Sequence, residues 1–117
     1  MDRRIELVIS LLENDTSRAW DTYKLATLVN LSASRFRHLF KFETGTSPRQ
    51  YLRELRLKKA EVLLVTTFLS LKEIAEAIGI HSVTHLMKDF KERHGMTPRE
   101  YRIAARMAAL KAKSKKH

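Results

Sequence analysis

Apolar and polar positions follow one another along this chain with the period of an α-helix. The first segment carries apolar residues at i, i+3, i+4 and i+7, which are Ile5, Val8, Ile9 and Leu12. This stripe predicts a helix that ends at the turn-forming pair Asn14 and Asp15. No stretch shows the clear alternation of a half-buried strand, and the chain holds only three glycines and two prolines. We therefore expect an all-α fold.

Helix caps and breakers divide the rest of the chain. The side chains that can cap a helix start are Asp21, Ser32, Ser47, Ser70, Ser82 and Thr97. The residues that stop a helix are Asn30, Gly45, Gly79 and Gly95. Together with the apolar stripes, these signals predict further helices over about 22–29, 33–43, 48–66, 71–78, 83–93 and from 98 onward, seven in all.

One signature occurs twice, because GTSPRQY begins at Gly45 and GMTPREY begins at Gly95. Each copy is a helix stop followed by a helix start, with proline at the first helical position. A helix, a tight turn and a second helix precede each copy. We therefore expect two helix-turn-helix units joined by a long central helix, divided as 1–46, 47–67 and 68–110, with a basic disordered tail over 111–117.

The second helix of each unit has one apolar and one polar face. At 100° per residue from Phe36, the outward residues of helix 33–43 are Ser34, Arg37, His38 and Lys41, with Arg35 on the flank. In helix 83–93 they are Thr84, Met87, Lys88 and Lys91, with His85 on the flank. A charge run taken alone is most often a solvated face. Its repetition favours DNA binding, because the second helix of a helix-turn-helix enters the major groove.

Composition narrows the class of function. The formal net charge of +10 favours a polyanionic partner. The absence of cysteine excludes disulfides and thiolate metal sites. The apolar run at the N-terminus is too short and too broken by charge for a signal peptide or a membrane span, so a cytoplasmic protein is expected. No nucleophile elbow, phosphate loop or HExxH motif is present, so we expect neither catalysis nor a cofactor.

The stretch from about Trp20 to Tyr101 closely resembles the DNA-binding domain of AraC/XylS-type transcription regulators. The most specific match is the C-terminal copy, IAEAIGIHSVTHLMKDFKERHGMTPREYR, and GTSPRQYLRELRL is similar to the segment that follows the first recognition helix. The resemblance implies a seven-helix fold with two helix-turn-helix units. The length is similar to that of the MarA, SoxS and Rob class of activators, or to that of an excised domain.

The resemblance also implies roles for individual residues. The positions that would read bases are Ser34, Arg37, His38, Thr84, His85, Met87 and Lys88. Apart from the resemblance, we assign five further cations to phosphate contacts, which position a protein on DNA without choosing a sequence: Arg35, Lys41, Arg49, Lys91 and Arg99. Arg37 is the strongest candidate for direct readout, because a guanidinium can bind guanine O6 and N7 together. Asp89, by contrast, is an acid beside the second DNA-facing helix and is expected to weaken phosphate attraction there.

The function expected from these observations is sequence-specific binding of double-stranded DNA by a transcription regulator. Kinship implies RNA polymerase as a further partner, and two reading helices in one chain predict a monomer on DNA rather than a dimer. A DNA-repair or architectural protein with the same fold is the main alternative. A module that lies on a membrane or on a partner through the last helix is the lesser one. His81, His85 and Asp89 have metal-ligand spacing but no fourth ligand, so no metal is expected.

Overall fold

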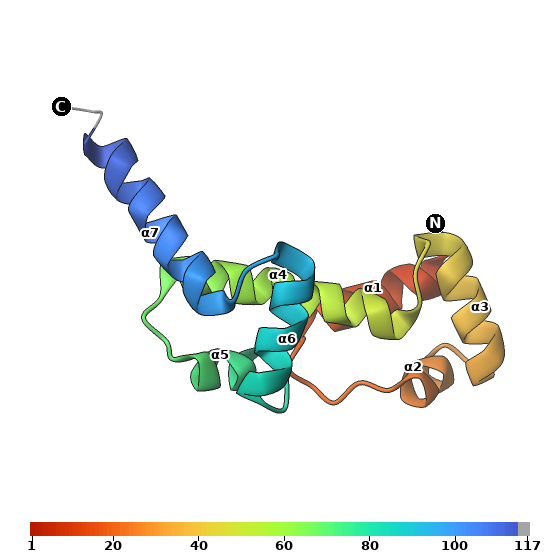
Figure 1. The fold of residues 1–117 in the computed structure, drawn as a ribbon. Coiled ribbons are helices and arrows are strands. Elements are labelled where there is room, and N and C mark those ends of the chain that lie inside the picture. Colours follow the sequence, from red (N-terminus) through yellow and green to blue (C-terminus); the bar gives the residue numbers. More distant parts are fainter. Residues whose placement is uncertain (115–117) are drawn as a thin grey trace. The chain divides into compact units, whose positions relative to one another are not determined.

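The computed structural model describes residues 1–114, and α-helix is the only regular secondary structure in this part of the chain, as predicted (Figure 1). The helices are α1 (Arg3–Asn14), α2 (Thr22–Leu28), α3 (Ala33–Thr44), α4 (Pro48–Thr66), α5 (Leu71–Ile78), α6 (Val83–His94) and α7 (Pro98–Ser114). Each boundary except the end of α7 lies within about two residues of the one that the caps and breakers predicted.

The predicted caps account for where the helices begin. Asp21, Ser32 and Ser82 each accept a hydrogen bond from a backbone N–H in the first turn of α2, α3 and α6. Ser47 does the same for α4, with 3.2 Å between Gln50 N and Ser47 Oγ. The cap of α1 was not predicted from the sequence. Asp2 accepts a hydrogen bond from the Arg4 N–H at 2.8 Å, so α1 begins at Arg3, two residues before the first apolar residue of its stripe.

The described residues form two compact units, and the boundary between them lies inside α4, at Arg56 and Leu57. The predicted division into separate segments 1–46 and 47–67 therefore differs from the observed one. The reason is that α4 contributes to both cores, with Leu52 in the first core and Leu57 in the second. The central helix α4 therefore contributes buried side chains to both cores and is not a separate linker.

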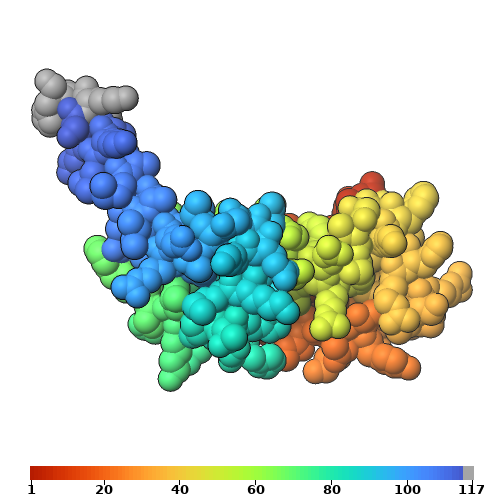
Figure 2. All heavy atoms as spheres, viewed as in Figure 1, coloured from red at the N-terminus to blue at the C-terminus, as the bar shows by residue number. Residues whose placement is uncertain are grey.

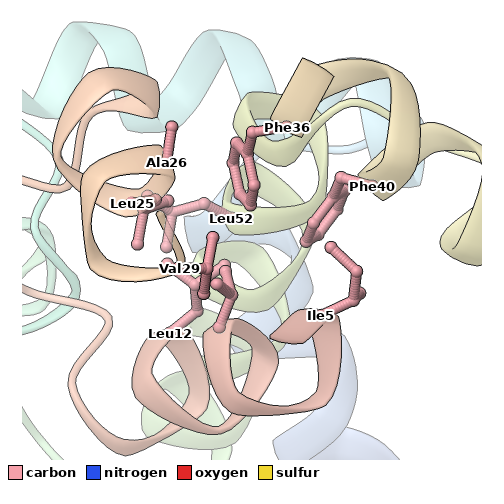
Figure 3. Close-up of a cluster of buried hydrophobic side chains, with 9 residues drawn as sticks. Ile5, Leu12, Leu25, Ala26, Val29, Phe36, Phe40 and Leu52 are labelled. Carbon is pink, nitrogen blue, oxygen red and sulfur yellow. The ribbon is translucent and has the colours of Figure 1, made fainter. Parts of the chain in front are cut away.

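The core of unit 1 collects apolar side chains from α1, α2, α3 and the first part of α4 (Figure 3). Its buried members are Ile5, Val8, Leu12, Leu25, Ala26, Val29, Phe36, Phe40 and Leu52. Arg56 fixes the loop that follows α1, because its Nε donates to Thr16 O at 2.9 Å and its Nη2 donates to Arg18 O at 3.1 Å. These bonds set the direction in which the chain enters α2.

The core of unit 2 is built in the same manner from the second part of α4, α5 and α6, with Tyr101 of α7 packed against it. Its buried members are Leu57, Ala60, Leu64, Ile74, Ala75, Ile78, Ile80, Leu86 and Phe90. Arg102 ties α7 to the end of α4, because its guanidinium donates to Leu64 O at 3.0 Å and to Thr67 O at 3.3 Å. The start of α7 is thereby fixed within unit 2.

The C-terminal segment corrects one prediction. Residues 111–117 were expected to be a disordered tail, but α7 continues to Ser114. Alanine, leucine and lysine have high helix propensity, and no breaker follows Pro98, so the helix propagates beyond its last contacts with the core. Lys111 and Lys113 also lie at the negative end of the helix dipole. The rest of the predicted tail, 115–117, lies outside the described residues.

Candidate nucleic-acid interface

The turn between α2 and α3 ends the first helix of unit 1 in a defined geometry. Asn30 has a positive φ of 62°, the left-handed conformation expected of a residue that stops a helix. Its N–H donates to Thr27 O at 3.1 Å, and the Leu31 N–H donates to Ala26 O at 3.0 Å. This pair of bonds is a Schellman motif, which satisfies the last carbonyls of α2 and turns the chain toward α3.

The turn between α5 and α6 repeats this arrangement in unit 2. Gly79 has a φ of 88°, and its N–H donates to Glu76 O at 3.3 Å. The Ile80 N–H donates to Ala75 O at 2.9 Å. Two sequences that differ at the left-handed position, asparagine in one and glycine in the other, therefore produce the same helix-turn geometry.

Packing then fixes the rotation of α3 and α6 about their own axes. In unit 1, Phe36 and Phe40 are fully buried, and Phe40 packs edge-on against Tyr51 with 5.4 Å between ring centroids. The corresponding residues of unit 2 are Leu86, Phe90 and Tyr101. Phe90 and Tyr101 repeat the edge-on contact at 5.2 Å. Because the apolar face of each helix is held inward, its opposite face points to solvent.

Every side chain predicted to contact DNA is exposed in the structure. In unit 1 these are Ser34, Arg35, Arg37, His38 and Lys41 on α3 and Arg49 at the start of α4. In unit 2 they are Thr84, His85, Met87, Lys88 and Lys91 on α6 and Arg99 at the start of α7. Atoms of α3, coloured orange to yellow, lie at the surface of unit 1 in Figure 2. Each unit thus presents a polar helix face with several cations, whose contacts with DNA stay a prediction.

Asp89 was expected to weaken the attraction of phosphates to the second DNA-facing helix, but the structure places it differently. Its side chain is only 12 % exposed, and its Oδ2 lies 3.0 Å from Nε2 of His85, whose side chain is 58 % exposed. The position follows Leu86 by three residues and precedes Phe90 by one, so it belongs to the inward side of α6. The carboxylate therefore pairs with an imidazole of the outer face instead of facing a phosphate.

One exposed cation near α3 could not be found from the sequence. Arg4 of α1 borders the same surface hollow as Ser34, Arg35 and His38 of α3. Helical periodicity relates residues within one helix only, so no spacing in the sequence joins α1 to this face. The packing of α1 against α3 in the unit 1 core brings them together.

Residues 1–114 hold neither a metal-binding cluster nor a membrane-spanning helix. Within 1–114, no group of three or more histidine, aspartate or glutamate side chains is arranged to hold a metal ion. His85 instead pairs with Asp89, as described above. The same part of the chain has no helix with the length and apolar character needed to cross a bilayer.

Comparison with known protein families agrees with this geometry. A family model described as a helix-turn-helix domain, of the AraC type, matches residues 25–104, from the middle of α2 into α7. The chain belongs to this family. The match includes most of the first helix-turn-helix unit, the whole of α4 and the whole of the second helix-turn-helix unit.

Individual transcriptional regulators are similar to this chain in sequence. The chain is 31% identical over 101 residues to the HTH-type transcriptional regulator MtrA of Neisseria gonorrhoeae, covering 86% of this chain and 34% of the relative. It is 33% identical over 106 residues to the RCS-specific HTH-type transcriptional activator RclR of Escherichia coli, covering 91% and 37%. The chain thus spans about a third of the length of these curated relatives.

Solved structures share the fold. The DNA-binding domain of AdpA, a global transcriptional factor solved in complex with a target DNA, superposes with a TM-score of 0.86 at 28% identity, covering 90% of this chain and 95% of that one. The C-terminal domain of the two-component response regulator yesN from Fusobacterium nucleatum gives a TM-score of 0.81 at 30% identity, covering 86% and 99%.

Proposed function

We propose that this protein is a transcription regulator that binds double-stranded DNA in a sequence-specific manner. The observation that carries the proposal is a structural unit that occurs twice. In each copy a Schellman turn and the edge-on contact of a buried phenylalanine with a tyrosine hold a polar, cationic helix face toward solvent. The names of the relatives, which are transcriptional regulators, and the DNA-bound state of the AdpA domain support it.

In this proposal α3 and α6 enter successive major-groove segments of one duplex. Arg37 donates to guanine O6 and N7 and so distinguishes a base pair, while Ser34, His38, Thr84 and Lys88 make further contacts with base edges. The cations Arg35, Lys41, Arg49, Lys91 and Arg99 neutralise phosphates and set the position of each helix on the backbone. His85 and Met87 complete the face that α6 presents to the bases.

The proposal is tested by selecting bound duplexes from a random library. We expect a conserved site with two blocks of preferred bases about one helical turn apart, one block for each reading helix. Hydroxyl-radical footprinting on the selected duplex should protect the backbone around both blocks. A single block, or binding with equal affinity to selected and random duplexes, would contradict the two-helix proposal.

Two finer features belong to the same proposal. We infer that one chain occupies one site, because two reading helices in one polypeptide make dimerisation unnecessary for a two-block site. Sedimentation of the complex with the selected duplex should give the mass of one protein per duplex. We also infer, from kinship alone, that a surface outside α3 and α6 contacts RNA polymerase, so that a reporter behind the selected site should respond to the protein.

A further inference from the structure

A surface hollow of about 520 Å³ lies in unit 1 between α1 and the flank of α3. Its polar lining is Arg4, Ser34, Arg35 and His38, and its apolar lining is Leu31, Leu39 and Phe42. This volume lies within the range of sites that hold small organic ligands. The hollow is thus lined by two guanidinium groups and an imidazole together with apolar side chains.

The proposed DNA-binding role does not explain Phe42. It is 81 % exposed although it is a large aromatic side chain. It lies on the flank of α3, turned away from the centre of the outward face that carries Arg37 and Lys41. Together with Leu31 and Leu39 it forms an apolar patch bordered by cations, and such patches can mark the surface that a ligand covers.

The second unit supports a special role for this hollow. With Gly45 aligned to Gly95, Leu39 corresponds to Asp89 and Phe42 corresponds to Glu92. Unit 2 therefore has the same helix-turn-helix scaffold but places acids at two of the three positions that form the apolar lining of the hollow in unit 1. The apolar and cationic combination is a property of unit 1 and is not needed to build the fold.

We propose that this hollow binds a small organic anion, a carboxylate attached to an aromatic ring. Arg4 already holds one carboxylate in the required manner, because its Nε and Nη2 lie 3.2 Å and 3.0 Å from the two oxygens of Asp2. The ligand carboxylate binds Arg35 in the same manner, and its ring packs on Phe42 and Leu39. The charge of Arg35 complements that of the ligand, and the His38 imidazole can donate a hydrogen bond to it.

A bound anion would cover Ser34 and His38, which the proposed function assigns to base readout. The ligand therefore competes with DNA for α3 and acts as an inhibitor of binding. This consequence rests on the proposed function, whereas binding of the anion does not. The two are tested separately.

The first experiment is a titration of the full chain with 2-naphthoate and with its neutral amide, 2-naphthamide, followed by ¹H–¹⁵N chemical shifts and calorimetry. We expect saturable shifts at Arg35, His38 and Phe42, and a dissociation constant for the amide about tenfold higher, because it lacks the charge-assisted hydrogen bonds. Equal binding of the two probes, or shifts centred elsewhere in the chain, would overturn the proposal.

Matched variants locate the site. Arg35→Gln and Phe42→Ser should each raise the dissociation constant of 2-naphthoate about tenfold. Arg3→Gln removes a neighbouring exposed cation of α1, and Phe68→Ser removes the other highly exposed phenylalanine, at 91 % exposure. Neither residue lines the hollow, so both controls should bind as the wild type does. Equal losses in controls and site variants would show nonspecific binding and overturn the assignment.

The second experiment measures binding to the selected duplex in the presence of 2-naphthoate. Competition predicts an apparent dissociation constant for DNA that rises in proportion to the free anion, and a much weaker rise for Phe42→Ser. Anion binding that leaves DNA affinity unchanged would overturn the inhibitory role. A chain that binds the anion but no duplex would instead contradict the proposed function.

Discussion

Arg37 and Lys41 are both exposed cations on α3, four residues apart, yet the proposal gives them different roles. The difference comes from the chemistry of the two groups. A guanidinium presents a planar pair of donors that matches the O6 and N7 acceptors of guanine. An ammonium is a compact charge that attracts any phosphate and carries no base preference.

Replacing each residue by alanine should separate these roles. Arg37→Ala should weaken the selected duplex by about 1 to 3 kcal/mol and random duplex much less, so that the ratio of the two affinities falls. Lys41→Ala should weaken both duplexes alike and make the salt dependence shallower by about one unit of slope. Lys72→Ala, an exposed lysine on α5, controls for the loss of one charge. Identical losses of specificity in Arg37→Ala and Lys41→Ala would refute the assignment of base readout to one residue and phosphate contact to the other.

Gly45 offers a test of backbone conformation at a single residue. It has a φ of 85°, and a Cβ added there would meet no heavy atom within 4 Å. Gly45→Ala should therefore lower the free energy of unfolding by about 1 to 2 kcal/mol through strain alone. Gly45→Asn should lower it less, because asparagine already occupies the left-handed position at Asn30. Urea unfolding measures both, and an unchanged midpoint for Gly45→Ala would contradict this explanation.

At the scale of the element, reciprocal caps define the starts of α5 and α7. Glu73 accepts from the Ser70 N–H at 3.0 Å while Ser70 Oγ accepts from the Glu73 N–H at 3.1 Å. Glu100 and Thr97 form the same pair of bonds at 3.0 Å and 3.2 Å. Each glutamate lies in the first turn, where the helix dipole also favours a negative charge.

The capping glutamates predict that the stability of the fold depends on pH. The backbone N–H of Ser70, and then its hydroxyl, lower the pKa of Glu73 below its ordinary 4.5. A lowered folded pKa gives a stabilisation that is complete above pH 4.5 and is lost as the pH falls through the folded value. Glu73→Gln should thus be less stable than the wild type near neutral pH, and the difference should shrink below about pH 4.5.

Thermal unfolding over a pH series measures this difference. Glu76→Gln removes another exposed glutamate of α5 that is not at the cap and so controls for net charge. A difference between wild type and Glu73→Gln that stays constant down to pH 3 would contradict a charged cap.

At the scale of the whole molecule, the net charge of +10 is the property that bears most on DNA binding. Cations that neutralise phosphates release counterions from the duplex, so affinity falls as salt rises. The five assigned phosphate contacts predict a slope of roughly −4 to −5 for the logarithm of the association constant against that of the salt concentration. Titrations of the selected duplex at several salt concentrations measure it. A slope near zero would contradict an electrostatic interface.

Much of the fold could be predicted from the sequence because its signals are local. The caps at Ser32 and Ser70, the stop at Gly79 and the prolines at 48 and 98 each act within one turn of helix. Burial of Phe36 followed from its place in an apolar stripe, and that burial fixed the outward direction of Arg37. The end of α7 was missed because helix propagation has no single-residue signal where a breaker is lacking.

The sequence by itself determined the seven helices, the two helix-turn-helix units and the polar residues on the outer faces of α3 and α6, because caps, turns and the 3.6-residue period are properties of neighbouring residues. Only the tertiary structure decided that α4 is shared between two cores, that Asp89 turns inward to meet His85, and that Arg4 joins Arg35 and Phe42 around one hollow. The shared helix and the hollow depend on contacts between different helices, which no periodicity along one chain segment encodes. The spacing of His85 and Asp89 is visible along α6, but only the packing of α6 on the unit 2 core decides that Asp89 is buried there.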